Sequence, residues 1–255
     1  MEFISSSWDI ILICSIIAFV SAIVTGFSGF GFALISVPLL SLFVDIKFGV
    51  PLVLLVAFFS VVVLSVNKLR FFRERIIYFI FIGMVIGIFV GTYFLANFKT
   101  DLLKKLLGLV IILFSLHIFL RARYERVQHR RKMTSGKVGM VIATLVGILS
   151  GVAGGMFGTS GPPLVVYVDY FAENKSAFRA QLLVLFVLHD LFRMYLYIRY
   201  SLINMEVVRF AVCLLPAVCL GLFIGSRMHF QVNEKIFGRA VATMLLVSGL
   251  LLLKP

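Results

Sequence analysis

Charged residues are scarce in this sequence. They make up 14% of its 255 residues, whereas 62% are hydrophobic, and an ordinary soluble domain has about 25% charged and about 45–50% apolar residues. Polar stretches long enough to form a separate domain are missing, while apolar runs of about 20 residues, the length that crosses a bilayer, recur along the chain. The composition excludes a soluble protein and predicts a single all-α polytopic membrane domain spanning residues 1–255.

Cysteine is almost absent, and no nucleotide-binding motif is present. The three cysteines, Cys14, Cys213 and Cys219, lie inside apolar runs without histidines at metal-binding spacing. The phosphate-binding pattern G-x-x-x-x-G-K-S/T does not occur. We therefore expect no metal, no cofactor and no ATP hydrolysis by this chain.

Acidic residues are few, since the sequence has 11 of them against 24 basic residues and a net charge of +13. Eleven of the basic residues lie in two short segments, Lys68–Arg75 and Arg121–Lys137. Such clusters mark the cytoplasmic loops of membrane proteins, where they also meet anionic lipid headgroups. We expect no nucleic-acid partner, and we expect residues 121–137 to form a basic cytoplasmic loop that contacts anionic phospholipids.

The two basic segments fix a predicted topology. Ile76–Ala96 and Leu102–Leu120 form two spans between them, and Val50–Val66 then runs from outside to inside. Before these lies a hairpin with arms Trp8–Val24 and Phe32–Val44, which either crosses completely or is re-entrant. The expectation is a multi-pass protein of a bacterial plasma membrane with both termini outside.

The second half of the sequence repeats the first. A shift of 125 residues aligns Gly26 with Gly151 and Pro38 with Pro163, and a shift of 134 aligns "GIFVGT" with "GLFIGS". We predict a first repeat at 1–120 and a second at 138–255, each a glycine- and proline-broken helical hairpin plus three spanning helices. An odd number of crossings inverts the second copy, as in many secondary transporters.

Both hairpins contain a stretch that disfavours regular helix: "TGFSGFG" in the first and "GGMFGTSGPP" in the second. Broken backbone at membrane depth must face protein or a watery cavity, and the amides at a helix start attract anions. We predict that the two breaks meet in a small polar pocket for an anion. The candidate substrate-binding residues are Thr25, Ser28, Gly29, Gly31, Gly154, Gly155, Gly158, Thr159, Ser160, Gly161 and Pro162.

Other glycines recur every four residues without proline nearby. This spacing is typical of close helix packing rather than of a binding site. The packing interpretation applies to Gly83, Gly87, Gly91, Gly221 and Gly225.

The strings "TGFSGFGFALISVPLL", "SGVAGGMFGTSGPPLVVY" and "AFRAQLLVLFVLHDLFRMYLY" together resemble the TauE/SafE family of sulfite exporter-like membrane transporters. The resemblance implies transport of a sulfur-containing anion, such as sulfite or an organosulfonate, in either direction. Arg179 of the "FRA" element is a further candidate, because it could supply a fixed positive charge to the pocket. Alternatively, Arg179 reaches the cytoplasmic interface or pairs with Glu173.

Ionisable residues inside a predicted span are the remaining candidates. Asp190 and Arg193 are three residues apart on one helical face and can neutralise each other. The alternative is a proton relay, in which His189 and Asp190 couple transport to protons.

The favoured interpretation is a secondary carrier, not an enzyme, with no catalytic residues. Export is favoured because an inside-negative potential drives anions outward by about 2.3 kcal/mol per charge per 100 mV. One alternative is an intramembrane serine protease of rhomboid type, since residues 158–161 spell G-x-S-G. Another is a membrane assembly protein that transports nothing. The sequence leaves the oligomeric state open, with a homodimer as one expectation.

Overall fold

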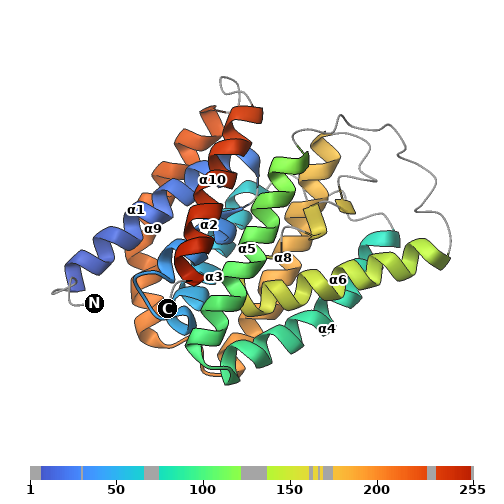
Figure 1. The fold of residues 1–255 in the computed structure, drawn as a ribbon, viewed down its shortest axis with the longest axis horizontal. Helices are drawn as coiled ribbons and strands as arrows, with labels where there is room; N and C mark the ends of the chain where they lie inside the picture. Colours follow the sequence, from blue (N-terminus) through green and yellow to red (C-terminus); the bar gives the residue numbers. More distant parts are fainter. Residues whose placement is uncertain are drawn as a thin grey trace.

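The computed structural model describes residues 7–29, 31–65, 75–121, 137–160, 163–165, 167–168, 175–228 and 234–253. These residues form helices joined by short turns, and none of them is in a β-strand (Figure 1). The predicted all-α fold is confirmed. Most of the basic loop at residues 121–137 lies outside the described part, so its side of the membrane and its phospholipid contacts stay predictions.

Nine helices make up most of the described chain, and residues 163–165 and 167–168 form short helical turns between α6 and α8. Six of the helices, α1, α3, α4, α6, α8 and α9, are long and apolar enough to cross a membrane. A multi-pass membrane protein is therefore established. The helices are α1 (Ser7–Ser28), α2 (Phe32–Leu40), α3 (Ile46–Ser65), α4 (Arg75–Asn97), α5 (Thr100–Arg121), α6 (Lys137–Phe157), α8 (Lys175–Arg199), α9 (Met205–Met228) and α10 (Glu234–Leu253).

Both broken hairpins begin with a helix that ends on a left-handed glycine. Gly29 follows α1 with φ 85°, and Gly158 follows α6 with φ 72°. Each glycine N–H donates at 2.7 Å to the carbonyl four residues earlier, Gly29 to Thr25 and Gly158 to Gly154. A left-handed residue at this position ends an α-helix, and glycine adopts it without a side-chain clash.

The breaks start later in the sequence than predicted. The first arm does not end at Val24, because α1 continues through Ser28, and residues 154–157 of the second string form the last turn of α6. Glycines within a helix are tolerated where another helix packs against them, so only the left-handed positions interrupt it. At about 1.5 Å per residue, α1 is about 33 Å long and can cross, whereas the nine-residue α2 is about 13 Å long and cannot.

Glycine permits two very close helix pairs, α4 with α6 and α1 with α9 (Figure 1). A methyl group added at Gly87 would collide with the Ile148 carbonyl, and one added at Gly225 with the Ile23 carbonyl. The predicted packing role of these glycines is confirmed. Gly83 lies against Thr144, and Gly87, four residues later in α4, lies against Ile148, four residues later in α6. Because the residue numbers rise together in both helices, the paired helices are parallel.

The two pairs match each other residue by residue. A Cβ at Gly155 would lie 2.6 Å from the Ile88 carbonyl oxygen, and one at Gly26 would lie 2.7 Å from the Leu222 carbonyl oxygen. The shift from Ile88 to Leu222 is the predicted 134, but the shift from Gly26 to Gly155 is 129. The alignment at 125 was therefore wrong by one helical turn. Because glycine recurs every four residues in this part of α6, a one-turn error still matches glycine to glycine.

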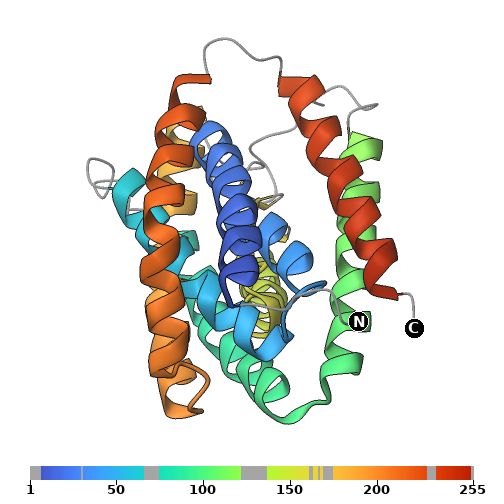
Figure 2. The same cartoon turned by 90° about the vertical axis from the view of Figure 1, so that its left-hand side faces the viewer.

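A third pair, α5 with α10, completes the arrangement (Figure 2). Ser115 Oγ donates to the Ala242 carbonyl at 2.7 Å, and Gly108 lies opposite Gly249, so this pair is antiparallel. Between the pairs lie α2, α3 and α8. The start of α1 and the end of α10 lie at the same end of the molecule (Figure 2); which side of the membrane this is stays a prediction.

Candidate functional site

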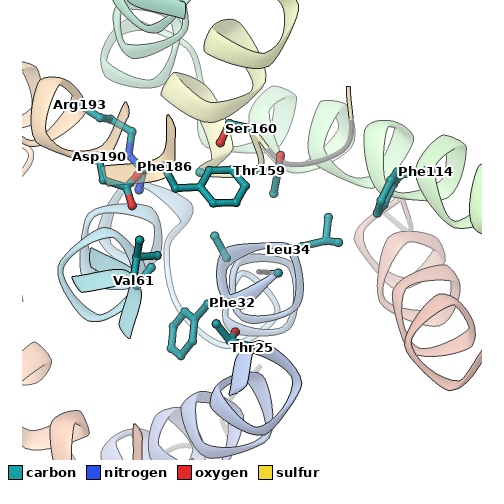
Figure 3. A pocket seen from close by; sticks show the side chains of 14 residues that line it. Thr25, Phe32, Leu34, Val61, Phe114, Thr159, Ser160, Phe186, Asp190 and Arg193 are labelled. Atoms are coloured by element: carbon teal, nitrogen blue, oxygen red, sulfur yellow. Dashed lines mark ion pairs between the residues drawn. The ribbon is translucent and has the colours of Figure 1, made fainter. Parts of the chain in front are cut away.

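The two breaks line one cavity, as the sequence predicted. Gly31 comes from the first break, and Gly158, Thr159 and Ser160 come from the second. The cavity volume is about 50 Å³. Figure 3 shows side chains from several helices around it. The other lining residues are Thr25, Phe32, Ala33, Leu34, Ala57, Val61, Phe114, Phe186, Asp190 and Arg193.

The start of α2 faces this cavity. Gly31 precedes the helix with φ 100°, and no side chain caps the helix start. Phe32, Ala33 and Leu34, the first turn of α2, all line the cavity. First-turn amides have no acceptor within their own helix, and the helix dipole makes this end positive. The break therefore offers backbone N–H donors to a negatively charged guest.

Among the described residues, the hydroxyl donors that remain available at the cavity come from the second break. Thr25 Oγ1 donates to the Ser21 carbonyl at 2.8 Å and Ser28 Oγ to the Val24 carbonyl at 2.7 Å, so both protons serve the turns of α1. Thr159 Oγ1 is buried and has no hydrogen-bond partner among the described residues. Ser160 lies beside it on the cavity wall (Figure 3). The sequence predicted hydroxyl donors from both breaks. In the described structure the second break supplies them, whereas the Thr25 and Ser28 hydroxyls of the first are already used within α1.

Arg193 is the cation of this site, although the sequence suggested it only as a partner for Asp190. Its side chain is only 1% exposed. Nη1 donates to the Gly154 carbonyl at 3.1 Å and lies 3.8 Å from Asp190 Oδ1. Nε and Nη2 are buried with no hydrogen-bond partner in the described structure. A guanidinium has five N–H donors, so this one keeps donors for a guest.

Arg193 also has a structural role at the end of α6. Its guanidinium and the Tyr197 hydroxyl, which donates to the Gly155 carbonyl at 2.7 Å, satisfy carbonyls in the last turn of that helix. A cation at a helix C-terminus is stabilising because that end of the dipole is negative. This role uses Nη1 alone. The signal for it in the sequence was the four-residue spacing of His189, Arg193 and Tyr197, which places them on one face of α8.

The glycines at the end of α6 make room for these side chains. A Cβ at Gly154 would collide with the His189 ring, and a Cβ at Gly158 would lie 2.9 Å from Arg193 Nη1. Gly155 faces α4 instead. Of these three predicted binding glycines, only Gly158 lines the cavity, and the other two act through the space that they leave.

His189 and Asp190, the predicted proton-coupling pair, lie next to Arg193. His189 Nδ1 is 2.9 Å from Asp190 Oδ1. Asp190 lines the cavity, whereas His189 is fully buried behind it and its Nε2 has no partner in the described part. Asp190 is thereby held between a histidine and an arginine on its own helix.

Several predicted site residues are not at the cavity or are not described. Ser28 and Gly29 do not line it. Gly161 and Pro162 lie outside the described residues, as does the Arg179 side chain, although Arg179 is within α8. In the described ranges, no group of three or more His, Cys, Asp or Glu residues could hold a metal ion.

Both charged residues among the described lining of the cavity come from α8. The predicted repeat makes α3 the counterpart of α8, yet the only charged residue of α3 is Lys47 in its first turn. From α3 the cavity receives Ala57 and Val61, and from α8 it receives Asp190 and Arg193.

Comparison with known proteins identifies the kind of chain to which this site belongs. A family model described as "Sulfite exporter TauE/SafE" matches residues 14–252, nearly the whole length. No curated protein and no solved structure matches the chain significantly.

Proposed function

The chain belongs to the sulfite exporter TauE/SafE family, and from this premise we propose that it is a secondary carrier that exports sulfite or a small organosulfonate by alternating access. Family membership supports a membrane transporter of a sulfur-containing anion rather than an enzyme. The substrate, the direction and the mechanism are the proposal.

The observation that carries it is a buried guanidinium with unused donors beside a small cavity. Arg193 Nε and Nη2 and the Thr159 hydroxyl have no partner in the described structure, and the uncapped start of α2 faces the same space. Buried polar groups without partners cost free energy unless a guest satisfies them. An oxyanion supplies acceptors and a compensating charge, and a cavity of about 50 Å³ favours a small anion such as sulfite.

The packing symmetry supports alternating access. Exchanging α1 with α6, α3 with α8, α4 with α9 and α5 with α10 maps the pair α1–α9 onto α6–α4 and the pair α5–α10 onto itself, as expected of a duplicated chain. The glycine contacts hold α1 to α9 and α4 to α6 as close units. In our proposal these units move relative to each other and open the cavity to either side in turn. An inside-negative potential then drives the anion out.

Purified protein in liposomes tests the proposal. Counterflow of labelled sulfite is expected, with competition by sulfoacetate or taurine and little competition by acetate. A protein that moves none of the sulfur anions, or that moves acetate equally well, contradicts the proposed substrate class.

Thr159 gives the first mutational prediction. Thr159→Val removes a donor to an anion, a hydrogen bond worth about 1.5–3 kcal/mol, so the KM for sulfite is expected to rise about 10-fold or more in the liposome assay. Thr25→Val is the matched control, because the Thr25 hydroxyl already donates to Ser21; its KM should stay within about 3-fold. Equal effects of the two substitutions would argue against Thr159 as a ligand.

Ser160 separates a carrier from the protease alternative. His189 Nε2 has no hydrogen-bond partner in the described part, so no bond joins it to Ser160 as in a serine–histidine pair. Ser160→Ala is expected to raise the KM for sulfite about 3- to 10-fold while the protein stays folded. Cleavage of a membrane-embedded peptide by the wild type, lost in this variant, would favour the protease.

A further inference from the structure

The cavity contains one cation and one carboxylate among its described lining residues, Arg193 and Asp190, both on α8. The shortest distance between them, from Nη1 to Oδ1, is 3.8 Å. This is too long for a direct N–H···O hydrogen bond, which spans about 2.7–3.2 Å. Asp190 therefore neutralises Arg193 without occupying its donors (Figure 3).

We propose that Asp190 is the internal counter-ion of the empty carrier. It keeps the unloaded cavity electrically neutral, and so lets the protein return without an anion, while Arg193 stays available for the next one. This inference rests on the proposed transport function and adds how the carrier resets.

The physical reason is the cost of an isolated charge in an apolar interior. A buried cation that loses its only counter-charge is strongly unfavourable, and Arg193 is only 1% exposed. A carrier that alternates between two sides passes through states in which the site is closed. Without Asp190, an empty closed site holds an unpaired guanidinium, whereas an anion-loaded closed site does not.

The contact with His189 holds the Asp190 carboxylate in place, so that it does not move onto the free donors of Arg193. His189 Nδ1 lies 2.9 Å from Asp190 Oδ1, so the carboxylate has a partner of its own. No other charged side chain faces this carboxylate from the cavity wall that the structure describes: α1, α2, α3, α5 and the second break contribute only uncharged residues. The nearby Tyr197 hydroxyl donates to the Gly155 carbonyl. An anion can thus accept from Nε and Nη2, side by side on the guanidinium, while Asp190 stays in place.

Net efflux and exchange distinguish this role, because only net efflux requires the empty carrier to return. Liposomes loaded with labelled sulfite are diluted either into sulfite-free buffer or into unlabelled sulfite. For Asp190→Asn, which preserves shape and an acceptor for His189, we expect net efflux to fall by at least about 100-fold, or about 2.8 kcal/mol at about 1.4 kcal/mol per factor of ten. Exchange should stay within about 3-fold of wild type.

Two variants serve as controls. Glu206→Gln removes an exposed carboxylate at the start of α9, and it should leave both rates unchanged. Asp190→Glu restores the charge and should recover net efflux at least in part. Protection of Asp190→Asn by sulfite against thermal unfolding is expected, since its cavity retains Arg193.

Three results with the Asp190→Asn variant would each overturn the inference: unchanged net efflux, an equal loss of efflux and exchange, or loss of sulfite protection. A wild-type flux that moves one proton with each anion and ignores the membrane potential would also overturn it, and would favour the predicted proton coupling through His189 and Asp190. A wild type with neither efflux nor exchange refutes the proposed function instead.

Discussion

Sulfite transport is expected to fall by at least about 100-fold when Arg193 is replaced by glutamine. Glutamine is too short to replace the hydrogen bond from Arg193 Nη1 to the Gly154 carbonyl at 3.1 Å, but that carbonyl still accepts from the Gly158 N–H at 2.7 Å, so the end of α6 keeps a donor. The charge and the paired donors are lost, and leaving Asp190 buried without its cation adds to the cost. The measurement is initial uptake into liposomes per amount of folded protein.

Matched substitutions give this prediction its controls. Arg193→Lys retains the charge but not the planar fork, so an intermediate loss of about 10-fold is expected. Arg199→Gln removes an exposed arginine from the same helix and should have little effect. If Arg193→Gln transported sulfite with the KM of the wild type, Arg193 would be a structural cap alone.

The second large effect concerns assembly of the helices. Gly87→Ala is expected to destabilise the protein by about 3 kcal/mol or more, because the added methyl group would collide with the Ile148 carbonyl and backbone cannot move aside as a side chain can. For a chain of this size, that corresponds to a fall of about 6–12 °C in the thermal unfolding midpoint. The midpoint in detergent is the measurement.

Gly49→Ala is the control for this substitution. A Cβ there would lie 3.4 Å from Val44 Cγ2, an ordinary contact, so the midpoint should change by less than about 2 °C. Similar midpoints for the two alanine variants would contradict the close packing of α4 on α6.

Much of the fold could be predicted because membrane insertion leaves strong marks on a sequence. The lengths of the apolar runs predicted the helices. The recurrence of "GIFVGT" as "GLFIGS" predicted the pairing of α4 positions with α9 positions that the glycine contacts show. The correspondence between α1 and α6 was wrong by a turn, because a four-residue glycine period aligns with itself at every turn. That ambiguity disappears only when the contacts of Gly26 and Gly155 are known.

The site was harder to predict than the fold. Glycine and proline marked the breaks, so Gly31, Gly158, Thr159 and Ser160 were correctly expected near one another. Arg193 was interpreted only as a partner for Asp190, since the spacing of two charges on a helix does not show whether they touch. Whether Thr25 offers its hydroxyl to a guest depends on its side-chain rotamer, which the sequence does not specify.

The presence of Arg193 on α8, without a charged residue from α3 at the cavity, predicts how many anions each polypeptide binds. If the chain is duplicated as predicted, α3 is the counterpart of α8, but Arg193 has no charged equivalent among the residues that α3 brings to the cavity. A saturating titration should therefore count one anion per polypeptide rather than two.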